Sequence, residues 1–171
     1  MPYIIILTGI IVLLIFWIMS VQRSLIVLEG NINNAMSQIG IQISSRWDAL
    51  SSLLELIKEY SEPEYITLRE MIKSRRSITK YSTPEDIYKQ ENAIADARRK
   101  IMTVAEHYQE LKSDKNYIKT MDAVNQYENM IRTSRLIFND SIAKLNRTIG
   151  MFPVSLVAGM LGFSRRIYLE V

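Results

Sequence analysis

An uncharged apolar segment near the start of the sequence restricts the fold more than any other feature. The 17 residues Tyr3–Met19 carry no charged side chain. At about 1.5 Å per residue, a helix of this length approaches the roughly 30 Å hydrocarbon thickness of a bilayer. Tyr3 and Trp17 lie near its two ends, where aromatic rings favour the membrane interfaces. We therefore expect a transmembrane anchor over residues 1–22, with membrane lipid as the partner of residues 3–19.

Two other interpretations of this segment fit less well. A cleaved signal peptide would have a basic residue before the apolar run and an A-x-A-like site after it, and the sequence has neither. A buried core helix that is apolar on every side is hard to cover in so small a domain. Arg23 follows the span and no basic side chain precedes it, so the positive-inside rule favours an outside N-terminus and a cytoplasmic domain.

Residues 23–150 predict a single helical domain. With only six Gly and four Pro in the chain, the composition favours long helices. No proline occurs between Tyr3 and Glu62, so the first helix should continue from the span as one rod. Short connections make successive helices antiparallel neighbours, which predicts an all-α, up-down four-helix bundle. Apolar spacing and capping residues place the helices at about 23–61, 64–81, 84–112 and 115–149.

Two features of this arrangement leave alternatives open. Gly30 and Gly40 lie within the first helix, where glycine lowers helix stability. They are either a tolerated cost in stability, which we favour, or points of close packing. Residues 151–171 form an apolar tail, of which 151–163 are uncharged and too short to span. This part either meets lipid or a partner, or packs across the end of the bundle.

Polar side chains interrupt the apolar seams of the helices. Arg46 occupies the heptad position of Ile32 and Ile39, and Glu128 and Arg135 occupy a seam of the last long helix. Buried charges are costly unless they are paired. The network either sets the packing register, which we favour, or binds a ligand or partner. The candidate residues for this internal polar network are Arg46, Glu106, Glu128, Arg135, Asn139 and Asn146.

The residues that common catalytic and binding sites require are scarce. The chain has no cysteine, and its one histidine, His107, is insufficient for a His-based metal cluster. There is no Gly-rich phosphate loop, and the net charge of +3 is spread along the chain without a basic-aromatic motif. We therefore expect no enzyme activity, no cofactor, no metal site and no nucleic-acid partner.

Four blocks of sequence, in order, carry a family resemblance. They are SQIGIQISSRWDAL (37–50), AEHYQELKSDKNY (105–117), YENMIRTSRLIFND (127–140) and FPVSLVAGMLGF (152–163). Together they resemble the LemA family of bacterial single-span membrane proteins. The chain departs from the family pattern at three places. Serine replaces the family's usual proline in the pair Ser51–Ser52, Gln109 stands where the family has proline, and Phe138 stands where it has tyrosine.

The resemblance implies a protein of the bacterial cytoplasmic membrane with a helical bundle and no established enzymatic activity. Members of this family often occur beside membrane zinc metalloproteases of the HtpX type, so the resemblance also raises the hypothesis of an accessory role. We accordingly expect a membrane-anchored scaffold or adaptor that forms a homo-oligomer or serves such a protease. The alternatives are a hydrolase or a small-molecule sensor that uses the polar network inside the bundle.

Overall fold

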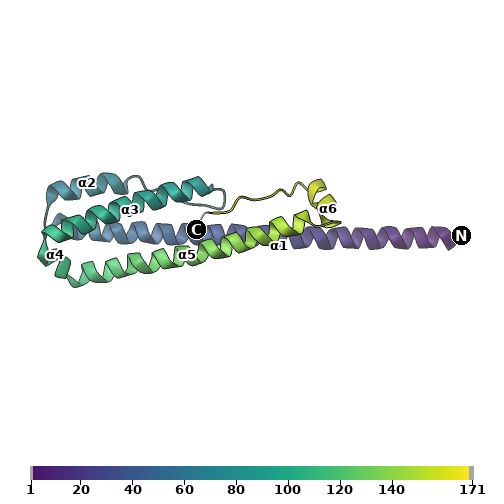
Figure 1. Cartoon of the computed structure of the whole chain (residues 1–171), viewed down its shortest axis with the longest axis horizontal. Helices are drawn as coiled ribbons and strands as arrows, with labels where there is room; N and C mark the ends of the chain where they lie inside the picture. Colours follow the sequence, from purple (N-terminus) through teal and green to yellow (C-terminus); the bar gives the residue numbers. More distant parts are fainter. Residues whose placement is uncertain (1, 170–171) are drawn as a thin grey trace. The chain divides into compact units, whose positions relative to one another are not determined.

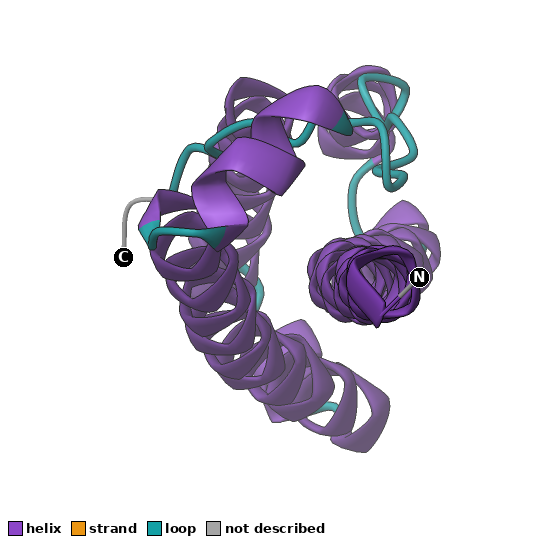
Figure 2. Ribbon diagram, turned by 90° about the vertical axis from the view of Figure 1, so that its right-hand side faces the viewer, coloured by secondary structure: helices purple, strands orange, loops and turns teal. Residues whose placement is uncertain are grey.

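The computed structural model describes residues 2–169, and in this part of the chain it contains helices and loops but no strand (Figures 1 and 2). The expectation of an all-α protein is therefore confirmed. The helices are α1 (Pro2–Lys58), α2 (Glu62–Ile72), α3 (Pro84–His107), α4 (Gln109–Ser113), α5 (Lys115–Gly150) and α6 (Val154–Met160).

Helix α1 contains both the apolar segment and the helix expected to follow it, without a break over 57 residues. No residue after Pro2 within this range forbids helical backbone, so the two parts are continuous. Among residues 2–169, α1 is the one helix long and apolar enough to cross a membrane. Residues 2–20 are exposed, so the protein itself does not cover the apolar segment.

The chain divides into two compact units, to which α1 and α5 both contribute. The central unit consists of residues 35–136, and the terminal unit combines residues 2–34 with 137–169. In the central unit, α2 and α3 lie side by side along the second half of α1 (Figure 1).

The core of the central unit is apolar, with a few specific polar ties between its helices. Trp47 of α1 is fully buried, and its Nε1 donates to Oε1 of Gln90 on α3 at 3.0 Å. Lys100 of α3 pairs with Glu64 of α2 at 2.8 Å. The largest fully buried side chains of this unit include Ile39, Ile43, Leu50, Leu53, Ile57, Leu68, Ile87, Ile94, Ile101 and Leu111.

Helix α2 ends at Ile72, whereas the sequence predicted a helix to residue 81. The expected end is wrong because tertiary hydrogen bonds replace helical ones in this stretch. The Arg76 backbone N–H donates to Gln90 Oε1 at 2.8 Å, and Gln90 Nε2 donates to the Ser74 carbonyl at 3.3 Å. Arg75 reaches across to Asp48 of α1 at 2.5 Å. Residues 73–83 therefore form an irregular connection between α2 and α3.

The helix expected over 84–112 is interrupted at Tyr108, where α3 ends and α4 begins. Tyr108 has extended backbone (φ −117°, ψ 91°), and its ring lies 6.0 Å from that of Tyr60. The start of α3 is as expected, because Thr83 and Asp86 form a reciprocal capping box. Asp114 caps α5 by accepting from the backbone N–H groups of Asn116 and Tyr117.

The terminal unit has its own small core. Its buried apolar residues are Val21, Leu25, Ile32, Phe138, Ile142, Leu145, Val157, Ala158 and Leu169. The apolar tail contains α6, in which Val157 and Ala158 are buried and Met160 is 88% exposed. Phe152, which precedes α6, is 81% exposed. Part of α6 therefore packs on this unit, and contact of the exposed apolar side chains of the tail with lipid or a partner stays a prediction.

Gly40 is a point of close packing, which overturns the preference for a tolerated cost at this position. A Cβ placed on Gly40 would overlap the carbonyl oxygen of Ile78 and lie 3.2 Å from its carbonyl carbon. That carbonyl belongs to the irregular 73–83 connection. A Cβ on Gly30 would meet nothing within 4 Å. Close packing therefore does not require glycine at position 30, which is consistent with a tolerated cost in helix stability.

We predict opposite effects for alanine at these two glycines of α1. Gly40→Ala should destabilise the protein by about 1–3 kcal/mol, because a backbone carbonyl cannot move aside as a flexible side chain would. Gly30→Ala should be neutral or stabilising by up to about 1 kcal/mol, since alanine favours helix. Chemical unfolding in detergent followed by circular dichroism measures both values. Equal stability of the two variants would rule out the close packing at Gly40.

Candidate functional site

A cluster of charged side chains joins α1, α3 and α5 in the central unit. Glu128 of α5 lies between two guanidiniums, 3.5 Å from Arg46 Nη2 of α1 and 3.6 Å from Arg98 Nη1 of α3. Arg46 is 5% exposed although it carries a full charge. Arg98 also donates to Asn125 Oδ1 at 3.0 Å. One carboxylate of α5 thus links both neighbouring helices.

A second ion pair of the cluster joins Arg135 of α5 to Glu91 of α3. Both side chains are largely buried, at 15% and 19% exposure. The Arg135 guanidinium also lies 5.4 Å from the ring centroid of Tyr88 on α3, within the range of a cation–π contact. This pair is therefore more sheltered than the Arg46–Glu128 pair, in which Glu128 is 43% exposed.

The electrostatics of the cluster are set by burial and by an excess of positive charge. Burial lowers the pKa of Arg46, although Glu128 and Glu91 act in the opposite direction. Burial also raises the pKa of Glu91, although the guanidiniums of Arg135 and Arg46 oppose it. The five side chains Arg46, Glu91, Arg98, Glu128 and Arg135 comprise three cations and two anions. They form a linked structural network in which each carboxylate contacts an arginine.

The terminal unit has a separate polar site, made by two amides of α5. Asn139 Nδ2 donates to the Leu169 carbonyl at 2.7 Å, and Asn139 Oδ1 accepts from the Leu169 N–H at 2.9 Å. Asn146 forms the same pair of bonds with the backbone of Arg166, each at 2.9 Å. We call residues 163–169 the tail segment and these two asparagines the amide clamp.

The structure brings together some of the residues expected in one polar network and separates others. Arg46, Glu128 and Arg135 are in the charged cluster. Asn139 and Asn146 hold the tail segment instead, and Glu106 is exposed on α3. The expectation of a single network is thus wrong, because Asn139 and Asn146 lie farther along α5, in the terminal unit, where their partners are backbone groups of the tail segment.

Sequence reasoning missed two members of the cluster, Glu91 and Arg98. A signal for both exists in the spacing. They are seven residues apart and interleave with Ile87, Ile94 and Ile101, which are fully buried on α3. A charged residue within a series of threes and fours that includes buried isoleucines occupies the same helix face.

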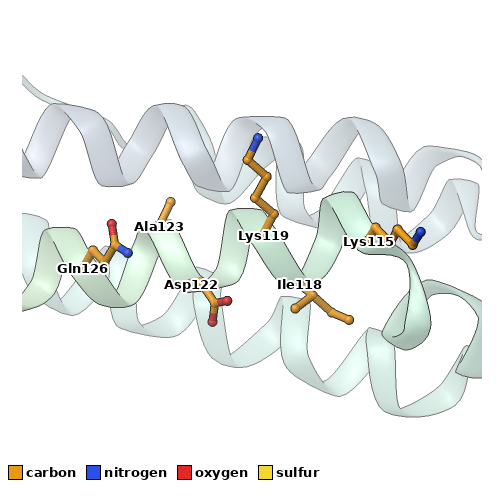
Figure 3. Close-up of a pocket in the computed structure, with 6 residues that line it drawn as sticks. All are labelled: Lys115, Ile118, Lys119, Asp122, Ala123 and Gln126. Carbon is orange, nitrogen blue, oxygen red and sulfur yellow. The ribbon is translucent and has the colours of Figure 1, made fainter.

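Residues 2–169 offer little to hold a metal ion or a small ligand. No group of three or more His, Cys, Asp or Glu residues in this range could hold a metal ion. The exposed His107 has its Nδ1 2.8 Å from the Thr103 carbonyl of its own helix. Figure 3 shows an open hollow on α5 whose lining has no paired acid and base of catalytic type. It is lined by Lys115, Ile118, Lys119, Asp122, Ala123 and Gln126.

Comparison with known protein families gives a match for this chain. The family model described as LemA family matches residues 35–171, which is most of the chain. The chain belongs to the LemA family. The LemA match covers the complete charged cluster and the amide clamp, and it begins within α1, after the apolar segment. No curated protein sequence matches the chain.

We predict that breaking the sheltered Arg135–Glu91 pair of this LemA protein destabilises it by about 2 kcal/mol. Full burial would cost roughly 3–5 kcal/mol, and the remaining exposure reduces that figure. Arg135→Met should show the loss, and the double variant with Glu91→Met should recover most of it. Chemical unfolding of the double-mutant cycle measures the coupling. Lys144→Met, at the exposed Lys144–Asp140 pair, is the control and should change stability by less than about 0.5 kcal/mol.

The effect of Arg135→Met should also depend on pH. Removing Arg135 removes an interaction that opposes burial, so the pKa of Glu91 in the folded protein should rise further above its ordinary 4.5. A carboxyl whose pKa is higher in the folded state favours folding below the unfolded pKa, and that contribution is lost as the pH rises through the folded pKa. Unfolding at pH 5 and pH 7 should therefore give the larger loss at pH 7. A larger loss at pH 5 would contradict this assignment.

Proposed function

We propose that this LemA-family chain is a single-pass protein of the bacterial cytoplasmic membrane whose helical domain acts as a scaffold or adaptor. The apolar part of α1 carries the proposal: only 6% of its most apolar 18-residue window is buried. Exposed apolar side chains around a whole helix need a non-aqueous environment. A bilayer supplies one of matching thickness.

The proposed topology places the N-terminus outside and the helical domain in the cytoplasm. Arg23 is exposed just beyond the apolar segment, which agrees with the positive-inside rule. In the central unit, ion pairs join α1 to α5, α2 to α3 and α3 to α5. We interpret these four helices as an antiparallel up-down bundle, since short connections join successive members.

A binding role fits the polar residues better than catalysis does. A general acid or base must exchange a proton with substrate, which needs an accessible group with few competing partners. Glu91 and Glu128 are instead held by arginines from neighbouring helices. This arrangement favours a fixed framework whose outer surface makes the functional contacts.

Exposed apolar side chains on α5 support self-association or a protein partner. Met130 and Leu136, both in the central unit, are each about half exposed, at 47% and 55%. We propose that this surface contacts other copies of the chain or a membrane protein, for which a membrane zinc metalloprotease is the first candidate to test.

We predict that two charges in the apolar segment release the protein from membranes. Ile10→Lys with Leu14→Lys should shift the chain from the carbonate-resistant membrane fraction to the soluble or aggregated fractions, because each lysine costs roughly 2.5–3.5 kcal/mol at a span centre. Ile66→Lys with Ile118→Lys is the matched control. Ile10 and Ile66 are both 51% exposed, with Leu14 at 51% and Ile118 at 48%. Release of the control to the same extent would refute the anchor.

The scaffold role predicts stable contacts in intact cells. Crosslinking before gentle solubilisation should capture a homo-oligomer or a complex with a membrane protease, identified by mass spectrometry. Reporter fusions at both ends of the chain would establish the orientation. A monomer with no retained partner at native expression level would be incompatible with the proposed role.

A further inference from the structure

The tail segment is bound to α5 in the way that a protein binds an extended peptide. Each asparagine of the amide clamp uses both its donor and its acceptor on the N–H and C=O of a single backbone residue, Leu169 or Arg166. A carboxamide satisfies both groups at once. The contacts therefore recognise backbone groups of the bound segment, not its side chains, and they fix the position of the segment along α5.

The spacing of the clamp matches the spacing of an extended chain. Asn139 and Asn146 are seven residues apart on a helix, which is about 10.5 Å of rise. Arg166 and Leu169 are three residues apart in the tail segment, which is about 10 Å in extended conformation. The two amides can thus engage every third residue of a straight segment without distorting it.

Two side chains of the tail segment add selectivity. The Arg166 guanidinium pairs with the Glu29 carboxylate of α1. Leu169 is 1% exposed, whereas Ile167 between them is 78% exposed. The clamp therefore fits an extended segment that has a cation at one position and an aliphatic side chain three residues later.

The tail segment reaches the clamp through a turn. Gly162 has φ of +79°, a backbone conformation that L side chains rarely adopt. Beyond this turn, the Phe163 N–H donates to the Ala158 carbonyl at 3.0 Å, and Ile167 and Tyr168 are exposed. The amide pairs and the Arg166–Glu29 ion pair then hold residues 164–169. A segment held by a few local contacts beyond a turn can be replaced by an identical segment with the same contacts.

We propose that the amide clamp is a docking site for the tail segment of a second copy of this chain, which enters it in place of the chain's own segment. Reciprocal exchange would give a closed, two-fold dimer. This inference rests on the proposed self-association and assigns it a specific interface. The charge complementarity of Arg166 with Glu29 and the burial of Leu169 select the C-terminal segment as the occupant.

The test uses two full-length variants with different affinity tags, expressed together. The clamp variant, Asn139→Asp with Asn146→Asp, keeps shape but loses the donors and sets carboxylates against backbone carbonyls. The tail variant, Arg166→Glu with Leu169→Asp, keeps the clamp but repels Glu29 and cannot bury its aliphatic anchor. Only the mixed pair contains a working clamp and a working tail on different copies. We expect several-fold higher co-purification for the mixed pair than for either variant with itself.

Matched controls separate docking from general damage. Asn129→Asp on α5 and Ile167→Ala in the tail segment alter exposed side chains and should behave as wild type. A synthetic peptide of residues 163–171 should dissociate the mixed pair, and the peptide with Arg166→Glu and Leu169→Asp should not. Circular dichroism verifies that each variant keeps its helices. If a variant unfolds, peptide binding to the wild-type chain decides the question instead, and an absence of binding overturns the proposal.

The possible results distinguish this inference from the proposed function. Wild-type copies that associate while the mixed pair does not would overturn tail exchange and leave the scaffold role intact. Equal association in every combination would mean that copies meet through another surface, which also overturns it. An absence of association in every combination, with a membrane protein recovered instead, would overturn exchange and assign the adaptor role to that partner.

Discussion

The uninterrupted helix α1 is the constraint on which the other features of this protein depend. A helix satisfies its own backbone hydrogen bonds, so its apolar part can enter lipid with no other element beside it. Farther along, the same helix provides Ile39, Ile43 and Trp47 to the core of the central unit. One secondary-structure element therefore carries two different hydrophobic surfaces, one that is exposed on every side over residues 2–20 and one that packs along a stripe in the core of the central unit.

The buried stripe of α1 also contains one charged residue, Arg46, which interacts with carboxylates of α3 and α5. Arg46 is next to Trp47 in sequence and nearly as buried, so it needs an anion nearby. Glu128 of α5 supplies it, and Glu91 of α3 adds a second negative charge. Such pairs contribute little net stability compared with apolar packing, because burial of both charges is costly. We interpret the cluster as a device that selects which helix faces meet, since a shifted register would leave an arginine buried without its carboxylate.

The sequence was sufficient to predict the helices whose signals are local. The proline-free run of α1, the Thr83 to Asp86 cap and the spacing of α5 all act within a few residues of each other. The end of α2 was not predictable in this way, because the hydrogen bonds that end it come from Gln90, on another helix. The close approach of Gly40 to Ile78 likewise depends on that irregular connection. Tertiary contacts of this kind have no local sequence signal.

The partners of the candidate polar residues were likewise hard to predict from local sequence signals. Arg46, Glu128 and Arg135 were recognisable because a charged residue at an apolar seam position is unusual. Their partners on α3, Glu91 and Arg98, could be found only by looking for charged residues at the seam positions of that helix as well. Asn139 and Asn146 were recognised as polar residues near one face, and yet their partners are backbone groups of the tail segment. Backbone groups are the same in every residue, so no side-chain pattern in the tail could have revealed this pairing. What the sequence does show is the seven-residue repeat on α5, and its match to three residues of extended chain is the physical reason that two asparagines suffice to hold that segment in register.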